Sequence, residues 1–314
     1  ASVLLRTESA SSSEIENLTS GARQIALAEI GEPASSNAQL VVSNVRAMQA
    51  ALALSESIDG RAILEMHRVL LEHSNPEIVG HWRDQQVWIG GGSLGPHTAQ
   101  FVPPHHDRVL ELMDDLVAFI KRDNLPLFAQ TAIAHAQFET IHPFPDGNGR
   151  VGRALIQAML RGGKLTHNVA VPVSAGLLHN TGQYFESLSA YRSGDIAPII
   201  RSLAEASFAG VHNGRILVAD LEAVQVNWRG RINARRDSAA HRLISVLLRQ
   251  PVIGAAAAAT ELDVSTVNAQ VAIDRLVDAD ILTQITSGRR NRIWLAKDVV
   301  RVLDEFGARA KRRR

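Results

Sequence analysis

The sequence predicts a mainly α-helical chain, in which a long helical part is followed by a small domain of short helices and strands. From Leu4 to about Phe208, apolar residues recur at spacings of three and four, and Gly, Pro or Ser-Asn separates the segments. Around Gln86 this spacing gives way to two β-capable pieces, and two more lie across Ser287-Gly288. The expected units are a helical domain over 1–215, a linker helix over 216–236 and a winged helix-turn-helix domain over 237–314.

The composition is that of a soluble globular protein, with 46% hydrophobic and 21% charged residues in 314. No apolar stretch reaches the ~18 to 20 residues that cross a bilayer, and no secretory segment opens the chain, so we expect a cytoplasmic protein without a membrane partner. The absence of cysteine excludes disulfides, thiolate metal sites and cysteine nucleophiles. A formal charge of +1 implies no general attraction to nucleic acid.

A β-hairpin is expected inside the helical part. The β-capable pieces Gln86–Ile89 and Ala99–Val102 flank a glycine-rich loop over 90–96. An isolated two-stranded hairpin is only marginally stable, so we expect it to serve as a flap.

The most informative stretch is a loop between two helices, His-Pro-Phe-Pro-Asp-Gly-Asn-Gly-Arg-Val-Gly-Arg at 142–153. The helix before it should begin near Pro126 and end at His142, because proline follows. The helix after it should begin after Asn148 and end at Gly162-Gly163. Loop and helix N-terminus are therefore adjacent.

This arrangement predicts a site for polyphosphate. Gly147 and Gly149 leave the backbone open to a ligand, and the helix N-terminus directs free N–H groups and a positive dipole end toward it. Arg150 and Arg153 lie on one helix face and could hold separate phosphates. Asp146 is placed to coordinate Mg²⁺ that bridges phosphates.

His142 is the candidate general base. An imidazole with an ordinary pKa of about 6.5 is available in its neutral form at cellular pH. A base held in position typically contributes ~10² to 10⁴ in rate.

Other interpretations of these residues fail on context. Residues 147–152 satisfy G-x-G-x-x-G, but a helix precedes them and no acidic residue follows about twenty positions later, so a dinucleotide site is not expected. The Lys-Ser/Thr pair of a P-loop is absent. His135 and His142 lack the glutamate of the zinc-protease arrangement, and His135 is expected in the core. A plain glycine-rich turn explains neither the His-Pro-Phe sequence nor two arginines on one face.

Residues 142–153 resemble the Fic motif, HPF-x-[D/E]-G-N-G-R-x-x-R, and match it at every specified position. The resemblance extends over roughly Leu4 to Leu203 and implies the Fic helical fold. The segments that resemble the family's flap and nucleotide-side helix are Gln86–Gly90, Phe101–Pro104, Tyr184-Phe185 and Gly194-Asp195.

The resemblance implies a protein adenylyltransferase. His142 would deprotonate a Tyr, Ser or Thr hydroxyl of a target protein, which attacks the α-phosphate of ATP and releases pyrophosphate. Asp146 would hold Mg²⁺, Arg153 the γ-phosphate and Tyr184 the adenine. The remaining nucleotide-binding residues would be Gly147, Asn148, Gly149, Arg150 and Gly152. Many relatives have a second Tyr and an Asn where this chain has Phe185 and Arg192, and the flap would bind the target by strand addition.

Residues 12–17 resemble the family's inhibitory pattern [S/T]-x-x-x-E-[G/N], in which Ser12 and Glu16 are the specified residues. A Glu16 carboxylate that reaches Arg153 would occupy the guanidinium that orients the γ-phosphate. Ser13-x-x-Glu16 is also a helix capping box, which would have no functional role. In some relatives the same glutamate could position a water that removes AMP from a modified target.

The C-terminal order of helix, short helix, turn, helix and two strands is typical of a winged helix-turn-helix, and an Arg-rich segment over 219–236 leads into it. Ser287–Arg292 would form a basic wing. The expected recognition helix carries Asp274 and Asp278, with Arg275 as its one cation, which suits DNA poorly. DNA binding and a protein-interaction or dimerisation role therefore both stay open, and the tail Lys311–Arg314 is expected to be a solvated end.

The expected function is therefore an autoinhibited transferase that uses ATP and Mg²⁺ on a protein target, which could be the chain itself. The chief alternative is a DNA-binding regulator whose Fic core binds nucleotide with little turnover. A third interpretation keeps the enzyme and changes the transferred group to UMP, phosphate or phosphocholine, although the phosphate site and both arginines favour a nucleoside triphosphate.

Overall fold

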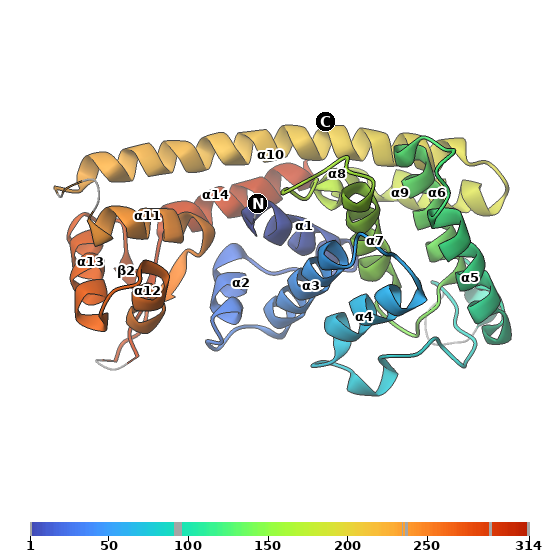
Figure 1. Ribbon diagram of the computed structural model, residues 1–314, viewed down its shortest axis with the longest axis horizontal. Helices are drawn as coiled ribbons and strands as arrows, with labels where there is room; N and C mark the ends of the chain where they lie inside the picture. The colour runs from blue at the N-terminus through green and yellow to red at the C-terminus, as the bar shows by residue number, and fades with distance from the viewer. Residues whose placement is uncertain (1, 91–95, 234, 236–237, 289–290, 313–314) are drawn as a thin grey trace.

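The computed structural model describes residues 2–90, 96–233, 235, 238–288 and 291–312, and these are mainly helical (Figure 1). Five helices surround one hydrophobic core that includes Met66, Phe138 and Leu155. These helices are α3 (Ser36–Ala53), α4 (Gly60–Leu71), α5 (Val109–Ile120), α6 (Leu127–Ile141) and α7 (Asn148–Gly162). The predicted boundaries of the two helices on either side of the loop at 142–153 agree with α6 and α7 to within one or two residues.

A second group of helices covers the other side of α6 and α7. Its core contains Ile156, Leu160 and Tyr184. The helices are α8 (Val173–Leu178), α9 (Thr181–Arg192) and the N-terminal half of α10 (Ala197–Arg231). The predicted Arg-rich helical segment is thus the end of a 35-residue helix that begins at Ala197 rather than near Ala219.

The first helix, α1 (Ser2–Ile15), packs against α3, α7, α8 and the C-terminal helix α14 (Lys297–Lys311). Its polar residues anchor it to each neighbour. The buried Glu8 carboxylate accepts hydrogen bonds from Ser174 in α8, from the backbone N–H at 2.9 Å and from Oγ at 2.6 Å. Lys311 of α14 forms an ion pair with Glu14 at 2.5 Å.

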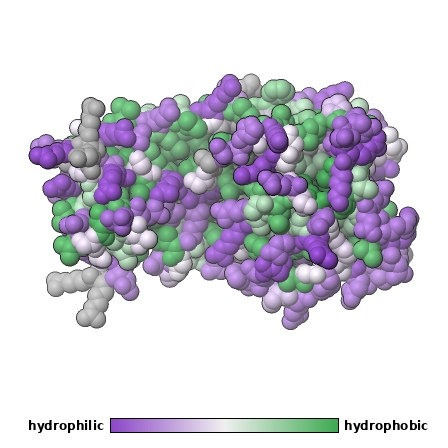
Figure 2. Space-filling model, viewed as in Figure 1, coloured by the Kyte–Doolittle hydropathy of each residue, from purple (hydrophilic) through white to green (hydrophobic). Residues whose placement is uncertain are grey.

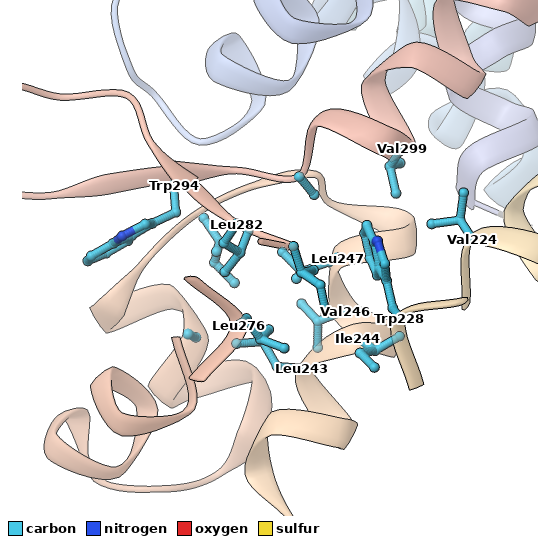
Figure 3. Close-up of a cluster of buried hydrophobic side chains, with 14 of the residues drawn as sticks. Val224, Trp228, Leu243, Ile244, Val246, Leu247, Leu276, Leu282, Trp294 and Val299 are labelled. Carbon is cyan, nitrogen blue, oxygen red and sulfur yellow. The ribbon is translucent and has the colours of Figure 1, made fainter. Parts of the chain in front are cut away.

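The C-terminal elements share a separate core around Trp228 and Trp294 (Figure 3). Trp228 anchors α10 to this core, because its ring is fully buried and Nε1 donates to Asp298 of α14 at 2.9 Å. The elements are α11 (Ala239–Arg249), β1 (Val252–Gly254), α12 (Ala255–Leu262), α13 (Thr266–Asp278), β2 (Thr283–Gln284), β3 (Ile293–Leu295) and α14.

The three strands form an antiparallel sheet in the order β1-β3-β2, with Ile253 opposite Trp294 and Thr283 opposite Leu295. The helices and the two strands around Ser287-Gly288 occur in the predicted order. Two elements were not predicted, β1 and α14, whereas α2 (Ala22–Glu29) lies within the predicted succession of helices. Lys311 ends α14 with an ion pair to α1, so this tail residue is not simply a solvated end. Arg289, Arg290, Arg313 and Arg314 lie outside the described residues.

The predicted hairpin is much smaller than expected. Within 86–90 and 96–102 the structure has one antiparallel bridge, between Ile89 and Phe101, and no longer strand. Residues 91–95 of the predicted glycine-rich loop lie outside the described part. Two polar side chains hold the base of this segment instead: Gln86 donates to the Pro103 carbonyl at 2.9 Å, and Arg83 donates to the Pro104 carbonyl at 2.5 Å.

Hydrophobic and hydrophilic residues are interspersed over the face that Figure 2 shows. None of the helices in the described ranges combines the length and hydropathy that a bilayer crossing requires.

Candidate active site

The site forms where α6 ends and α7 begins. His142 is the C-cap of α6 and has a left-handed backbone, with φ 51° and ψ 62°. This conformation is uncommon for a residue other than glycine and persists only where its surroundings enforce it. Here Arg83 does so: its Nε donates to the His142 carbonyl at 2.8 Å, and its own backbone N–H donates to the Pro143 carbonyl at 2.9 Å.

The loop between the two helices is fixed by contacts within itself and to α4. Both groups of the Asn148 side-chain amide bind the backbone of Phe144, at 2.8 and 2.9 Å. The Phe144 ring stacks on His67 with centroids 3.7 Å apart, and His67 Nε2 lies 3.1 Å from the Asp146 carbonyl oxygen. The Asn148 side chain is thus already bound within the loop. The group of Asn148 that remains for its predicted phosphate contact is the backbone N–H at the start of α7.

Asp146 and Arg150 lie side by side at the N-terminus of α7. Arg150 approaches the Asp146 carboxylate at 3.4 Å, while its Nε and the other terminal nitrogen are buried and have no acceptor among the described residues. Asp146 is open, with a side-chain exposure of 59%, and its other carboxylate oxygen accepts from the Gly147 N–H at 2.6 Å. Buried guanidinium N–H groups without acceptors are costly, so an anion bound here would satisfy them. The geometry thus fits a polyphosphate whose metal is held by Asp146.

These residues line a hollow of about 360 Å³ together with Glu16, Gly147 and Leu71. Gly147 is the N-cap of α7, with φ 83°, and a Cβ there would lie 3.0 Å from Leu70. A left-handed turn without a side chain therefore brings the first N–H groups of α7 to this hollow.

Glu16 binds Arg153, as expected from the inhibitory pattern, and Ser12 binds it as well, a contact that was not predicted. The Arg153 guanidinium is fully buried; it donates to Ser12 Oγ and to the Ser12 carbonyl at 2.9 Å each, and to Glu16 Oε1 at 2.8 Å. The Glu16 carboxylate lies over the first turn of α7, because a Cβ on Gly149 would be 2.0 Å from Glu16 Oε1. The carboxylate thus occupies the place where the glycines leave the backbone open.

The capping-box interpretation of Ser13 and Glu16 is wrong. Both residues lie at the C-terminal end of α1, and Ser13 Oγ donates to the Ser9 carbonyl. Glu16 instead ends the helix: the Asn17 N–H binds the Glu14 carbonyl and the Leu18 N–H binds the Ser13 carbonyl, at 2.9 and 3.0 Å. This is a Schellman motif, with Asn17 in the left-handed region at φ 62°. The preference for Gly or Asn after the glutamate therefore has a conformational cause.

Burial governs the electrostatics of the site. Burial lowers the pKa of His142 to about 4, although the backbone of Glu139 supports its charged form, so the imidazole is neutral at neutral pH. Burial raises the pKa of Glu139 to about 7. Burial alone would also raise the pKa of Glu16, but the charge and hydrogen bond of Arg153 lower it overall, and the carboxylate is ionised.

Tyr184 is buried, with 1% of its surface exposed, and its hydroxyl lies 2.8 Å from His135 Nε2. Burial raises its pKa above the ordinary value. His135 is itself fully buried, as expected for a core histidine. Gly152 faces the same region, where a Cβ would lie 2.7 Å from Glu139 Oε1. Tyr184 and Gly152 therefore lie next to the site on the side of the protein interior. Their predicted nucleotide contacts stay predictions.

Three residues that support the site were missed in the sequence. Arg83, His67 and Glu139 hold or face the loop, but the first two come from segments about 60 to 80 residues away. Single-sequence patterns carry no signal for such distant pairs. Glu139 precedes His142 by three positions, so helical spacing could have placed it beside the loop.

Known proteins resemble this chain in sequence and in fold. Residues 57–160 match the Fic/DOC family. The chain contains a Fic domain. A Fic family protein from Desulfovibrio desulfuricans G20 aligns with 93% of this chain and 86% of its own, at a TM-score of 0.57 and 22% identity, and so shares the fold. Fic-1 of Caenorhabditis elegans aligns at a TM-score of 0.52 and 24% identity, covering 66% and 61% of the two chains.

Two curated relatives are similar over nearly half of the chain. Protein adenylyltransferase fic-1 of C. elegans is 32% identical over 153 residues, or 48% of this chain and 27% of the relative. Protein adenylyltransferase Fic of Aedes aegypti is 33% identical over 146 residues, or 46% and 26%. The chain thus spans about a quarter of the length of these relatives.

Proposed function

We propose that this chain transfers AMP from ATP to a Tyr, Ser or Thr hydroxyl of a protein and releases pyrophosphate. The observation that carries the proposal is the set of buried Arg150 N–H groups without acceptors, next to an open Asp146 carboxylate and the first turn of α7. The names of the curated relatives, which are protein adenylyltransferases, support this reaction.

In the proposed reaction His142 removes the proton of the target hydroxyl. The hydroxyl oxygen bonds to the α-phosphorus, the bond from that phosphorus to the bridging oxygen breaks, and pyrophosphate leaves. A pKa of about 4 keeps His142 able to accept the proton at neutral pH. Arg83 holds the left-handed backbone of His142, and this backbone fixes the point from which the imidazole side chain extends.

Asp146 would hold Mg²⁺ together with phosphate oxygens, and the metal would supply positive charge that offsets the phosphates. Arg150 would pair its free N–H groups with the β- and α-phosphate oxygens, and Arg153 would orient the γ-phosphate. Binding of these groups places the α-phosphorus in line with the attacking hydroxyl.

Glu16 is proposed to inhibit this reaction. Its carboxylate pairs with Arg153 and covers Gly149, so the same guanidinium and the same backbone surface are unavailable to the γ-phosphate. ATP would then bind without the orientation that transfer requires. The carboxylate could also orient a water toward an AMP-modified residue, and loss of AMP from an isolated modified target in the parent but not in Glu16→Gly would support that minor activity.

The test is transfer of label from α-³²P-ATP with Mg²⁺ in the parent chain, Glu16→Gly and Glu16→Gly/His142→Ala, on the chain itself and in a cell lysate. Strong labelling in Glu16→Gly alone is expected. Absence of labelling in all three, while each still binds ATP, would overturn the transferase and favour a nucleotide-binding regulator or a different donor. Equal labelling of the parent and Glu16→Gly would overturn the inhibitory role alone.

For the C-terminal region, we propose a winged helix that binds protein rather than DNA. The order α11, β1, α12, α13, β2, β3 supports the winged-helix assignment. The outer face of α13 exposes Val267 and Val271 beside two carboxylates, a surface poorly suited to a phosphate backbone. Fluorescence anisotropy with a labelled random duplex should show no binding at about 0.15 M salt; salt-dependent binding would restore the DNA interpretation.

A further inference from the structure

An exposed apolar stripe runs along α10. Phe208 and Val226 are 78% and 71% exposed, and Val211 and Val218 are also exposed. At about 100° per residue these four side chains fall within roughly 80° of the helix circumference. The stripe lies opposite the core-facing side of α10, which carries Leu217, Val224 and Trp228.

The stripe lies where a binding partner can reach it. The helix forms the upper edge of the molecule in Figure 1 and bridges the two cores beneath it. A row of exposed large apolar residues on one face of a soluble protein is typical of an interaction site. Arg215 and Glu222 stand between the apolar residues, and neither forms an ion pair with any residue that the structure describes.

We propose that a second copy of this chain occupies the stripe, with its own α10 antiparallel to the first. A two-fold axis that crosses the helix between Val218 and Ala219 places Val211 of each copy against Val226 of the other. The same axis places Arg215 against Glu222 twice, so that each unpaired charge gains a partner of opposite sign.

The rest of the stripe fits this register. Phe208 falls opposite Arg229, an arrangement that allows the guanidinium to lie over the ring. Antiparallel helices also place opposite dipole ends together. A parallel pair would instead bring Arg215 to Arg215 and Glu222 to Glu222, and like charges in such positions are unfavourable.

The contact is long and narrow. In this register residues 206–231 of the two helices overlap, which corresponds to about 39 Å of helix. Only one face of each helix takes part, so the contact has fewer residues than the about 20 to 30 a side of a standard interface, and we expect a weak dimer. An isologous contact of this kind closes on itself as a dimer.

The test is the mass of the full chain in solution by light scattering and by sedimentation at about 100 µM, well above the micromolar dissociation constants of weak interfaces. The expected mass is twice the 34.1 kDa of one chain. Val218→Asp puts two carboxylates at the axis and should raise the dissociation constant at least about tenfold. The control is Leu110→Asp, which changes a 60% exposed leucine of α5 and should leave the mass unchanged.

Charge exchange tests the orientation. Arg215→Glu alone and Glu222→Arg alone each create two like-charge contacts and should shift the chain to a monomer, whereas the double exchange Arg215→Glu/Glu222→Arg should restore the dimer. A monomeric parent would overturn the proposal, as would a dimer unaffected by Val218→Asp. A double exchange that stays monomeric while circular dichroism shows it folded would overturn the antiparallel register. None of these outcomes depends on AMP transfer.

Discussion

Ser12→Ala measures the contact that keeps α1 on the site. Ser12 is fully buried and its Oγ accepts from Arg153 Nε at 2.9 Å, so alanine leaves that N–H without an acceptor. A hydrogen bond to a charged group contributes about 1.5–3 kcal/mol. We therefore expect the free energy of unfolding to fall by about 2 kcal/mol. Ser11→Ala, on the same helix and also buried, has no bond to Arg153 and should cost less than about 1 kcal/mol.

A double-mutant cycle separates this contact from general damage to α1. Urea unfolding followed by circular dichroism would be measured for Ser12→Ala, Arg153→Met and the pair. In the Arg153→Met background the serine has no guanidinium to bind, so the coupling energy should be about 1–2 kcal/mol. Equal costs for Ser12→Ala with and without Arg153, or equal costs for Ser12→Ala and Ser11→Ala, would refute the reasoning.

Three further predictions follow from the same geometry. Gly152→Ala puts a Cβ 2.7 Å from Glu139 Oε1 and 3.0 Å from Phe138, and should lower stability to urea by about 1–3 kcal/mol, whereas Gly230→Ala, with nothing within 4 Å, should not. Asn17→Val forces a β-branched residue into the left-handed region and should cost about 1–2 kcal/mol, while Asn17→Gly should be tolerated; equal costs would contradict the turn described here. The His142 ring signals should not titrate by NMR between pH 8 and 5. Because its folded pKa of about 4 lies below the unfolded value of about 6.5, its contribution to stability is complete above pH 6.5 and is lost toward pH 4.

The sequence contained enough information for the loop and its two helices, because their boundaries depend on local chemistry. Proline after His142 disfavours continuation of the first helix, and the paired glycines at 162–163 favour the end of the second. The Arg153 contact with Glu16 was predicted from a family pattern, and the structure brings the two side chains together across the fold.

The remainder depends on distant contacts. Ser13-x-x-Glu16 has the letters of a helix start, yet it lies at a helix end, because the burial of α1 against four neighbouring helices decides where the helix runs. The β-capable pieces near Gln86 pair through one bridge, and the side chains of Arg83 and Gln86 hold the segment instead. Arg83 shows no local signal for its role at the site, since the His142 and Pro104 carbonyls that it binds come near it only after folding.

The anchoring of α1 decides how Glu16 can leave. Glu8, buried against Ser174, and Glu14, paired with Lys311, fix the helix along its length, so it does not slide away as a body. Glu16 follows the last helical residue, in a turn that the backbone N–H groups of residues 16–18 close with three hydrogen bonds. Opening that turn is a local unfolding event of a few residues, far less costly than undocking the helix. The equilibrium between the covered and the uncovered site therefore depends on the free energy of opening this turn, which amide exchange at residues 16–18 reports.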